Sequence, residues 1–226
     1  MAITVTAVND VPTWSASASD VSGNEDAAIS ITGSTIADVD DSSMDSFTMS
    51  STQGGTYSLA QTTGLTFSTG DGTADNAMVF GGTVANINLA IATITWTSAS
   101  NDNTNAVLTM TPNDGDADGA DDTVAITVNA VNDVPTWSAS AADVSGNEDT
   151  AISITGAAIA DVDDTTMDSF TMSSTQGGTY SLAQTTGLTF STGDGTADNA
   201  MVFGGTVANI NLAIATITWT SASNSN

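Results

Sequence analysis

The sequence predicts an all-β protein made of tandem Greek-key β-sandwich repeats, with one short helix in each repeat. Residues 7–14 return as residues 130–137, a spacing of 130 − 7 = 123, so the chain is a repeat array. Short runs of alternating apolar and polar residues are separated by clusters of Gly, Asn and Asp. Such alternation is typical of strands with one buried face, and tandem repetition is typical of units that each contact only their neighbours.

The two copies have diverged little. Residues 2–103 and 125–226 align over 102 positions, of which 8 differ and 102 − 8 = 94 are identical, which indicates a recent duplication within a longer array. Pro12 and Pro135 restrict the backbone at the boundary motif Asn-Asp-Val-Pro. We expect 1–9 to be the terminal strand of a preceding repeat, 10–132 a complete repeat, and 133–226 a second repeat that lacks its last two strands.

Period-two alternation places the strands along the repeat. Gly54 and Gly55 separate two of the apolar runs, which predicts a tight hairpin turn. Trp96 shares a face with Ile94, which favours core packing over exposure. The apolar positions that mark the strands are Ile29 and Ile31, Phe47 and Met49, Tyr57 and Leu59, Leu65 and Phe67, Ile94 and Trp96, and Val124, Ile126 and Val128.

One stretch departs from this alternation. Val84, Ile87 and Ile91 lie at helical spacing, and Thr83 stands where it could cap the first turn. The sequence therefore predicts one short helix after Thr83 and its copy in the second repeat.

The charge of the chain excludes several partners. It contains 24 Asp and 2 Glu but no Lys, Arg, His or Cys, which gives a formal charge of −26. Such a chain repels nucleic acid and anionic membranes, and it cannot neutralise its own carboxylates with side-chain cations. The N-terminus lacks the pattern of a signal peptide or a membrane span, so direct membrane insertion is not expected.

The acidic residues gather in motifs that suit a hard cation. Both glutamates, Glu25 and Glu148, occupy the same repeat position in Asn-Glu-Asp. Carboxylate and amide oxygens at alternating positions suit Ca²⁺, whereas the absence of His and Cys makes zinc and copper poor candidates. The predicted ligands are Asn9, Asp10, Glu25, Asp38, Asp40, Asp41, Asp102, Asp114, Asn132, Asp133, Asp161, Asp163 and Asp164.

Strand parity predicts which of these residues converge. If the strand that begins at Trp14 descends from the linker, Glu25 and Asp102 lie at the bottom of the unit. Asp38 and Asp114 then lie at the top. The bottom of one unit would face the top of the next across the linker, and we expect the cation there.

These motifs resemble cadherin repeats, in which a base glutamate, an Asp-x-Asp and an Asx-rich linker bind Ca²⁺ between domains. By this resemblance Glu25 is the base glutamate, Asp161 and Asp163 are the Asp pair of the following domain, Asn132 and Asp133 are linker ligands, and Asp114 is the acidic residue after the sixth strand. The cadherin Asp-Arg-Glu segment has no match, since residues 101–103 read Asn-Asp-Asn. That leaves the ligand at this position open.

The whole unit is similar to the cadherin-like tandem repeats of large bacterial surface and RTX-type adhesins. The resemblance lies in Val-Asn-Asp-x-Pro, Asn-Glu-Asp, Asp-x-Asp, Thr-Gly-Leu-Thr-Phe (63–67), Gly-Asp-Gly (70–72), the segment 80–88 and the strand 122–128. It implies an extracellular, non-catalytic Ca²⁺-rigidified stalk or fibre segment on a bacterial surface, whose partners are the neighbouring repeats.

Two other functions are weighed against this one. A carbohydrate- or protein-binding module would present Trp14 or Trp96 to its ligand. A glycosidase would need a carboxylate pair, which is the only catalytic equipment that this composition permits.

Head-to-tail self-assembly is a further expectation. Residues 1–8 match the last strand of the repeat, so they could complete the open unit of another molecule and build a filament. The alternative is that these boundaries only reflect a segment taken from a continuous array.

Overall fold

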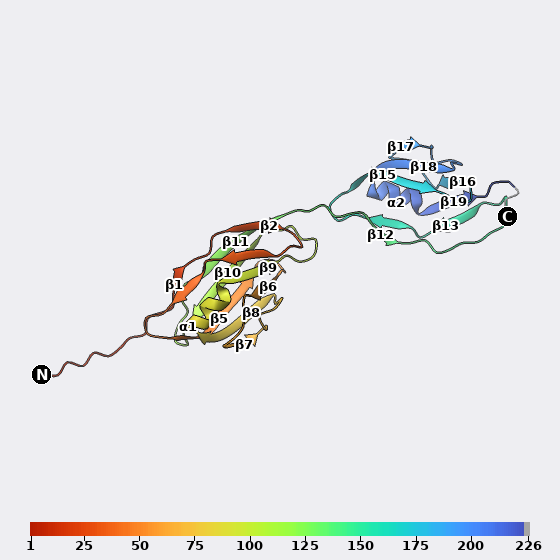
Figure 1. Ribbon diagram of the computed structural model, residues 1–226. Coiled ribbons are helices and arrows are strands. Elements are labelled where there is room, and N and C mark those ends of the chain that lie inside the picture. Colours follow the sequence, from red (N-terminus) through yellow and green to blue (C-terminus); the bar gives the residue numbers. More distant parts are fainter. Residues whose placement is uncertain (224–226) are drawn as a thin grey trace. The chain divides into compact units, whose positions relative to one another are not determined.

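The computed structural model describes residues 1–223, and the chain divides into two compact units. The first unit is Met1–Val131, and the second begins at Asn132 (Figure 1). Each unit is mostly β-structure and carries one short helix, as the sequence predicts. The units are described one at a time.

The first unit contains eleven strands and the helix α1. Its elements are β1 (Thr13–Ala16), β2 (Val21–Asn24), β3 (Ile29–Thr32), β4 (Thr35–Ala37), β5 (Ser43–Ser51), β6 (Thr56–Leu59), β7 (Leu65–Thr69), β8 (Ala77–Thr83), α1 (Val84–Ile91), β9 (Thr93–Thr97), β10 (Ala106–Asn113) and β11 (Asp122–Asn129).

Two main sheets enclose the core of this unit. The larger has the order β2-β11-β10-β5-β8-β7, and the smaller has the order β3-β9-β6. A two-stranded ribbon, β1-β4, completes the unit. All the pairs are antiparallel except β2 with β11, which run parallel. The crossovers between sheets give the sandwich topology that the sequence predicts.

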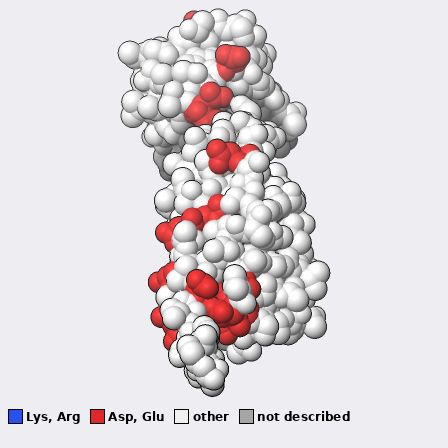
Figure 2. Space-filling view, turned by 90° about the vertical axis from the view of Figure 1, so that its left-hand side faces the viewer, with Lys and Arg blue, Asp and Glu red and all other residues white. Residues whose placement is uncertain are grey.

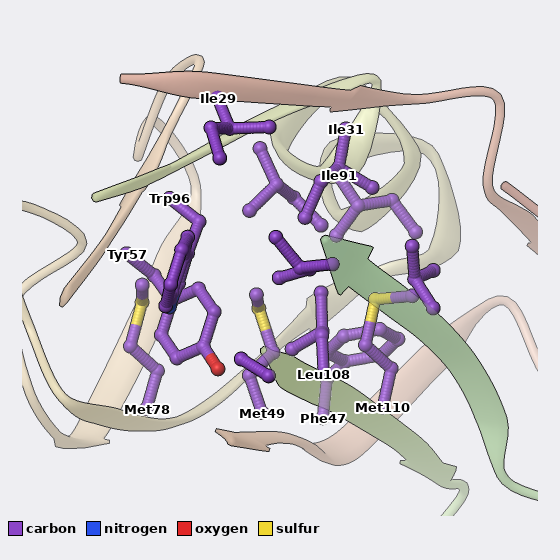
Figure 3. Packing of buried hydrophobic residues seen from close by; sticks show 14 of the residues in the cluster. Ile29, Ile31, Phe47, Met49, Tyr57, Met78, Ile91, Trp96, Leu108 and Met110 are labelled. Atoms are coloured by element: carbon purple, nitrogen blue, oxygen red, sulfur yellow. The ribbon is translucent and has the colours of Figure 1, made fainter. Parts of the chain in front are cut away.

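The core follows the period-two pattern closely. Along β11, Val124, Ile126 and Val128 are 0, 1 and 6 % exposed, while the residues between them face solvent. Trp96 and Tyr57 are fully buried, which confirms the prediction that Trp96 belongs to the core. Figure 3 shows their rings packed together beside the methionine and isoleucine side chains of the same cluster. The core thus forms where the buried faces of several strands meet.

The helix begins where the sequence predicts. Thr83 caps α1 by accepting a hydrogen bond from the Asn86 amide at 3.2 Å. Ile87 and Ile91 face the core and are fully buried. The helix therefore closes one side of the sandwich through a single apolar face.

The predicted hairpin turn at Gly54 and Gly55 is wrong. These glycines join β5 in the larger sheet to β6 in the smaller one, so they cross between sheets and do not reverse one ribbon. A Cβ added to Gly55 would lie 2.6 Å from Cε2 of Trp96. The glycine is needed because the crossing passes directly against the buried indole.

The second unit repeats part of this architecture. Its sheets are β15-β18-β17, β13-β19-β16 and β12-β14. Within its described residues it has no counterparts of β2, β10 and β11. Its elements are β12 (Thr136–Ala139), β13 (Ile152–Thr155), β14 (Ala158–Ala160), β15 (Thr166–Ser173), β16 (Thr179–Leu182), β17 (Leu188–Thr192), β18 (Ala200–Thr206), α2 (Val207–Ile214) and β19 (Thr216–Thr220).

Residues 1–12 form no strand in this structure. Whether 1–9 serve as the last strand of a preceding repeat stays a prediction. Both helices are eight residues long, and among the described residues no helix is long and apolar enough to cross a membrane.

Candidate metal centre

Acidic and amide side chains gather at the end of the first unit where the linker residues Asn9 and Asp10 enter it. The Asp10 amide donates to Oδ2 of Asp40 at 2.8 Å, and Nδ2 of Asn9 donates to Oδ2 of Asp114 at 3.0 Å. These contacts join the linker to two loops that are far apart in the sequence. We call this group the linker-side cluster, and it consists of Asn9, Asp10, Asp38, Asp40, Asp41 and Asp114.

Asp38 organises the first of these loops. Its Oδ1 accepts hydrogen bonds from the amides of Asp40 at 2.9 Å and Asp41 at 2.8 Å, which fixes the tight turn after β4. Its Oδ2 is shielded from solvent and has no hydrogen-bond partner. One oxygen therefore builds the turn, and the other remains available to a ligand.

The second loop contributes Asp114. Its Oδ1 accepts from the amides of Asp116 and Ala117, both at 2.8 Å. The hydrogen bond from Asn9, followed by that from Ala117, lowers the pKa of Asp114 below its ordinary value. Asp114 is therefore held as a carboxylate at the top of the unit, where strand parity predicts it.

Crowding of like charges acts on Asp41. Partial burial, and then the neighbouring carboxylates, raise the pKa of Asp41 above its ordinary value. The carboxylates that contribute are Asp38, Asp114, Asp116 and Asp40, in decreasing order. No side-chain cation exists in the chain to offset this repulsion (Figure 2, which shows red acidic surface and no blue).

The second unit repeats the linker turn. The Asp133 amide donates to Oδ2 of Asp163 at 2.5 Å, and Oδ1 of Asp161 accepts from the amides of Asp163 and Asp164 at 3.0 and 2.8 Å. Oδ2 of Asp133 is shielded from solvent and has no partner. Asn132, Asp161 and Asp164 line an open hollow beside this turn.

Glu25 occupies the opposite end of the first unit and is buried, with 3 % of its surface exposed. Its Oε1 accepts from the Val131 amide at 2.8 Å, and its own amide donates to the Asn129 carbonyl at 3.0 Å. Its Oε2 is buried without a partner. A buried carboxylate oxygen without a partner is costly, which makes Glu25 a candidate ligand.

Asp26 is a residue near this end that the sequence analysis missed. Its carboxylate accepts from the Asn101 amide at 3.1 Å, and its own amide donates to Oγ of Ser98 at 3.0 Å. Its φ of 55° lies in the left-handed region, which Asp adopts more readily than most residues. The signal in the sequence was its place directly after Glu25.

The carboxylate of Asp102 accepts a hydrogen bond within its own loop. Its Oδ1 accepts from the Thr104 amide at 2.9 Å, and the hydrogen bonds from Thr104 lower the pKa of Asp102. Asn101 links this loop to Asp26, so the structure brings the loop to the Glu25 end as parity predicts. No hydrogen bond connects Asp102 to Glu25 within the described residues.

The predicted ligands thus form separate groups. Within residues 1–223, no three acidic side chains converge in an arrangement that could hold a metal ion. Glu25 and Asp102 belong to the first unit, whereas Asn132, Asp133, Asp161, Asp163 and Asp164 belong to the second. Among the described residues, the first unit has two buried carboxylate oxygens without a partner, Oε2 of Glu25 and Oδ2 of Asp38, and the second has one, Oδ2 of Asp133.

The tryptophans that a sugar-binding module would use are not free. Trp96 is fully buried. Trp14 is half-buried, packs edge-on against Phe47, and donates from Nε1 to the Ala120 carbonyl at 2.7 Å. Neither indole forms an open platform in the first unit.

Comparison with known proteins gave limited matches. No family model matches the chain, and no curated protein matches it. Among solved structures, the chicken CNTN1 FN1–FN3 domains are similar at 9 % identity and a TM-score of 0.25, over 95 % of this chain and 55 % of that one. The N-terminal eight Ig domains of DSCAM isoform 1.30.30 give 9 % and 0.22, over 88 % of this chain and 24 % of that one. The N-terminal Ig1–2 module of Drosophila DLAR is similar at 8 % identity and a TM-score of 0.21, over 87 % of this chain and 84 % of that one.

Proposed function

We propose that this chain is a Ca²⁺-binding, non-catalytic structural repeat of an extracellular bacterial adhesin, stalk or fibre, in which the metal stiffens the array. The observation that carries the proposal is Glu25. This carboxylate is 3 % exposed, and one of its oxygens has no partner. The chain contains no Lys, Arg or His, so no side-chain cation pairs with this carboxylate.

The linker-side cluster adds independent support. Oδ2 of Asp38 is likewise shielded and unpartnered. In the second unit the shielded, unpartnered oxygen belongs to a different residue of the linker turn, Oδ2 of Asp133, the copy of Asp10. Two like charges about 4 Å apart repel by about 1 to 4 kcal/mol, depending on the effective dielectric constant. Ca²⁺ accepts six to eight oxygen ligands at about 2.3 to 2.6 Å and so relieves several such pairs at once.

The proposed ligands fall into three sets. Asn9, Asp10, Asp38, Asp40, Asp41 and Asp114 form the linker-side set of the first unit; Asn132, Asp133, Asp161, Asp163 and Asp164 form that of the second; Glu25 and Asp102 are ligands of the opposite end of the first unit. Bound Ca²⁺ would supply positive charge and cross-link loops that hydrogen bonds alone now hold. The side chains would bind and orient the ion, and no reaction follows.

The adhesin assignment comes from the sequence motifs. Near-identical tandem units serve reach and multivalency more often than chemistry, since each contacts only its neighbours along one axis. The chain has no Cys, which is compatible with an extracellular location. The bacterial surface is the location implied by the resemblance to cadherin-like adhesin repeats.

Melting and small-angle scattering, with and without chelator, test this function. In Ca²⁺ we expect a higher melting temperature and a larger, better-defined maximum dimension than in EDTA. Mg²⁺ at the same concentration is the control, because it prefers a strict octahedral shell and retains its waters. An unchanged melting temperature and maximum dimension in EDTA would exclude a stiffening role for Ca²⁺.

A further inference from the structure

Strand β6 lies at the edge of the smaller sheet, whose order is β3-β9-β6. Its residues pair with β9 on one side only, so the backbone groups on its other side point away from the sheet. An open strand edge is a template on which a strand of another chain can pair. The way this edge is covered therefore matters in a chain of near-identical repeats.

The loop between β7 and β8 covers the edge of β6. The Tyr57 amide donates to the Asp75 carbonyl at 2.7 Å, and the Asp75 amide donates to the Tyr57 carbonyl at 3.0 Å. The Leu59 amide donates to the Gly72 carbonyl at 3.0 Å. Residues 70–76, which we call the edge loop, thus reach from the larger sheet to the edge of the smaller one. They take the place that a further strand would occupy.

Hydrogen bonds to two side chains hold the edge loop in shape. Oδ2 of Asp75 accepts from the amides of Asp71 at 2.8 Å and Gly72 at 2.7 Å. Oγ of Ser58, on β6, accepts from the Ala74 amide at 2.9 Å. Ala74 has a φ of 54°, in the left-handed region that a residue with a Cβ rarely adopts. These contacts therefore hold a backbone conformation that is unfavourable by itself.

The second unit builds the same edge loop. The Tyr180 amide donates to the Asp198 carbonyl at 2.7 Å, and the Asp198 amide donates back at 2.9 Å. The Leu182 amide donates to the Gly195 carbonyl at 3.0 Å, and Ala197 again has a left-handed φ, of 53°. Within its described residues this unit has no copies of β2, β10 and β11. The edge loop is therefore a local property of the repeat that does not depend on those strands.

We propose that the edge loop keeps β6 from pairing with another copy of the chain, and that the Asp75 side chain holds the loop in place. When the loop is displaced, the outward backbone groups of β6 become a pairing site for β6 of a second copy. β6 and its counterpart β16 both read Thr-Tyr-Ser-Leu, so every copy offers the same edge. Two identical edges satisfy each other's backbone groups in one antiparallel contact.

Two further observations favour a second copy as the partner. Near-identical repeats are prone to misassembly, because a segment of one repeat fits the neighbours of another. Asp71 and Asp75 also place two carboxylates beside β6, and charged side chains at a strand edge oppose pairing with other strands. No residue of the edge loop belongs to the proposed Ca²⁺ ligand sets, so this role is separate from metal binding.

Sedimentation velocity in EDTA over a dilution series tests the proposal. The variant Asp75→Ala/Asp198→Ala removes the holding carboxylate from both units. We expect it to lose monomer in favour of dimers and larger species at concentrations where the parent does not change. The matched control is Asp45→Ala/Asp168→Ala, which removes the same charge from two exposed strand positions and should sediment as the parent does.

A second variant displaces the loop without changing the net charge. In Gly70→Ala/Gly193→Ala the added Cβ atoms would lie 2.6 Å from Oδ2 of Asp75 and 2.7 Å from Oδ2 of Asp198. The two carboxylates must then move, and we expect the same loss of monomer. Assembly of this variant cannot come from reduced repulsion between copies.

Amide exchange shows whether the edge is uncovered. In both variants the amides of Tyr57 and Leu59 should exchange faster than in the parent, while the amides of β11 keep their rates because the fold is intact. Variants that stay monomeric overturn the proposal. Unchanged exchange would then show that Asp75 does not hold the loop, and faster exchange would show that the uncovered edge is not a pairing site.

Cysteine trapping identifies the strand that pairs. The chain contains no Cys, so Ser58→Cys in the Asp75→Ala/Asp198→Ala background introduces a single thiol on β6. We expect disulfide-linked dimers to form faster than from Ser30→Cys in the same background, because Ser30 lies on β3 at the opposite edge of the sheet. Equal rates from the two positions would assign the assembly to another surface and overturn the proposal.

Discussion

The two units place nearly the same sequence in two environments. Over 94 of 102 aligned positions the residues are identical, yet their burial differs. Phe47 and Tyr57 are fully buried in the first unit, whereas their copies Phe170 and Tyr180 are half-buried in the second. In the first unit β10 pairs with β5 and β11 with β10, and the described part of the second unit has no such strands.

The comparison teaches that partner strands, and not local sequence, decide how deeply a side chain is buried. The local elements form in both units, including the helix with its Thr cap and the ribbon β12-β14 that copies β1-β4. The strand β2 behaves differently. It exists only where β11 is present to pair with it, and its copy at residues 144–147 remains without strand structure.

The largest expected contrast is in the aromatic core. Phe47→Ala should lower the free energy of unfolding by about 3 to 5 kcal/mol, because a fully buried ring leaves a cavity. Phe170→Ala should cost clearly less, since its ring is already half-exposed. Urea unfolding followed by tryptophan fluorescence measures both variants, and equal losses would show that burial does not separate the units.

The next contrast is at the paired glutamates. In metal-free buffer, Glu25→Ala removes the acceptor of the Val131 amide but also removes a buried, unpaired oxygen, so the two effects oppose each other. In Ca²⁺ the second effect disappears, and we expect a loss of about 1 to 3 kcal/mol. Glu148→Ala, at an exposed position, should stay within about 0.5 kcal/mol in either buffer. Thermal melts in Ca²⁺ and EDTA distinguish these outcomes.

The two tyrosines should respond differently to loss of the hydroxyl group. The Tyr57 hydroxyl is buried without a hydrogen-bond partner, and burial raises the pKa of Tyr57 to about 12. Tyr57→Phe should therefore be neutral or stabilising by up to about 1 kcal/mol. The Tyr180 hydroxyl donates to the Ser173 carbonyl at 3.2 Å, so Tyr180→Phe should cost about 0.5 to 1 kcal/mol. Denaturant unfolding measures the stability of both variants. A destabilised Tyr57→Phe variant would contradict the observation that the Tyr57 hydroxyl has no hydrogen-bond partner.

The smallest expected contrast concerns pH. The pKa of Asp41 is raised in the folded state, so its ionisation destabilises the fold as pH rises through and above its ordinary range. Without metal, Asp41→Asn should raise the melting temperature at pH 7. At a pH well below the ordinary pKa of Asp, where Asp41 is protonated, the variant and the parent should melt at the same temperature. Asp164→Asn should have a smaller effect, because the described second unit has no copies of Asp114 and Asp116. A larger effect at Asp164 would show that these loop carboxylates do not act on Asp41.

Much of the fold was predictable because it depends on local periodicity. Alternation marked Val124, Ile126 and Val128 as a buried face, and spacing with a Thr cap marked α1. The role of Gly55 was not predictable in this way. Its glycine is required by contact with Trp96 across the core, and a local pattern cannot distinguish that requirement from a hairpin.

The two ends of the first unit were also predictable in outline. Strand parity places Asp40 and Asp114 at one end of the unit and Glu25 with the loop of residues 101–103 at the other. The hydrogen bonds join Asp40 to Asp10 and Asp114 to Asn9, and they join Asn101 to Asp26, the residue after Glu25. Whether an individual carboxylate oxygen has a hydrogen-bond partner was not predictable. It depends on which amides reach each carboxylate, as at Asp38, where one oxygen builds the turn and the other is left unpartnered.

The most direct test of Ca²⁺ binding is calorimetric titration with Ca²⁺ of the parent chain and of two variants, Glu25→Ala and Asp45→Ala. All three proteins are first stripped of metal with a chelator, which is then removed. Asp45 is an exposed acid outside the proposed ligand sets, which makes it the matched control. We predict saturable Ca²⁺ binding by the parent, clearly weaker binding or fewer bound ions in Glu25→Ala, and unchanged binding in Asp45→Ala. Equal affinity and stoichiometry in all three proteins, or no binding heat in the parent, would contradict the account.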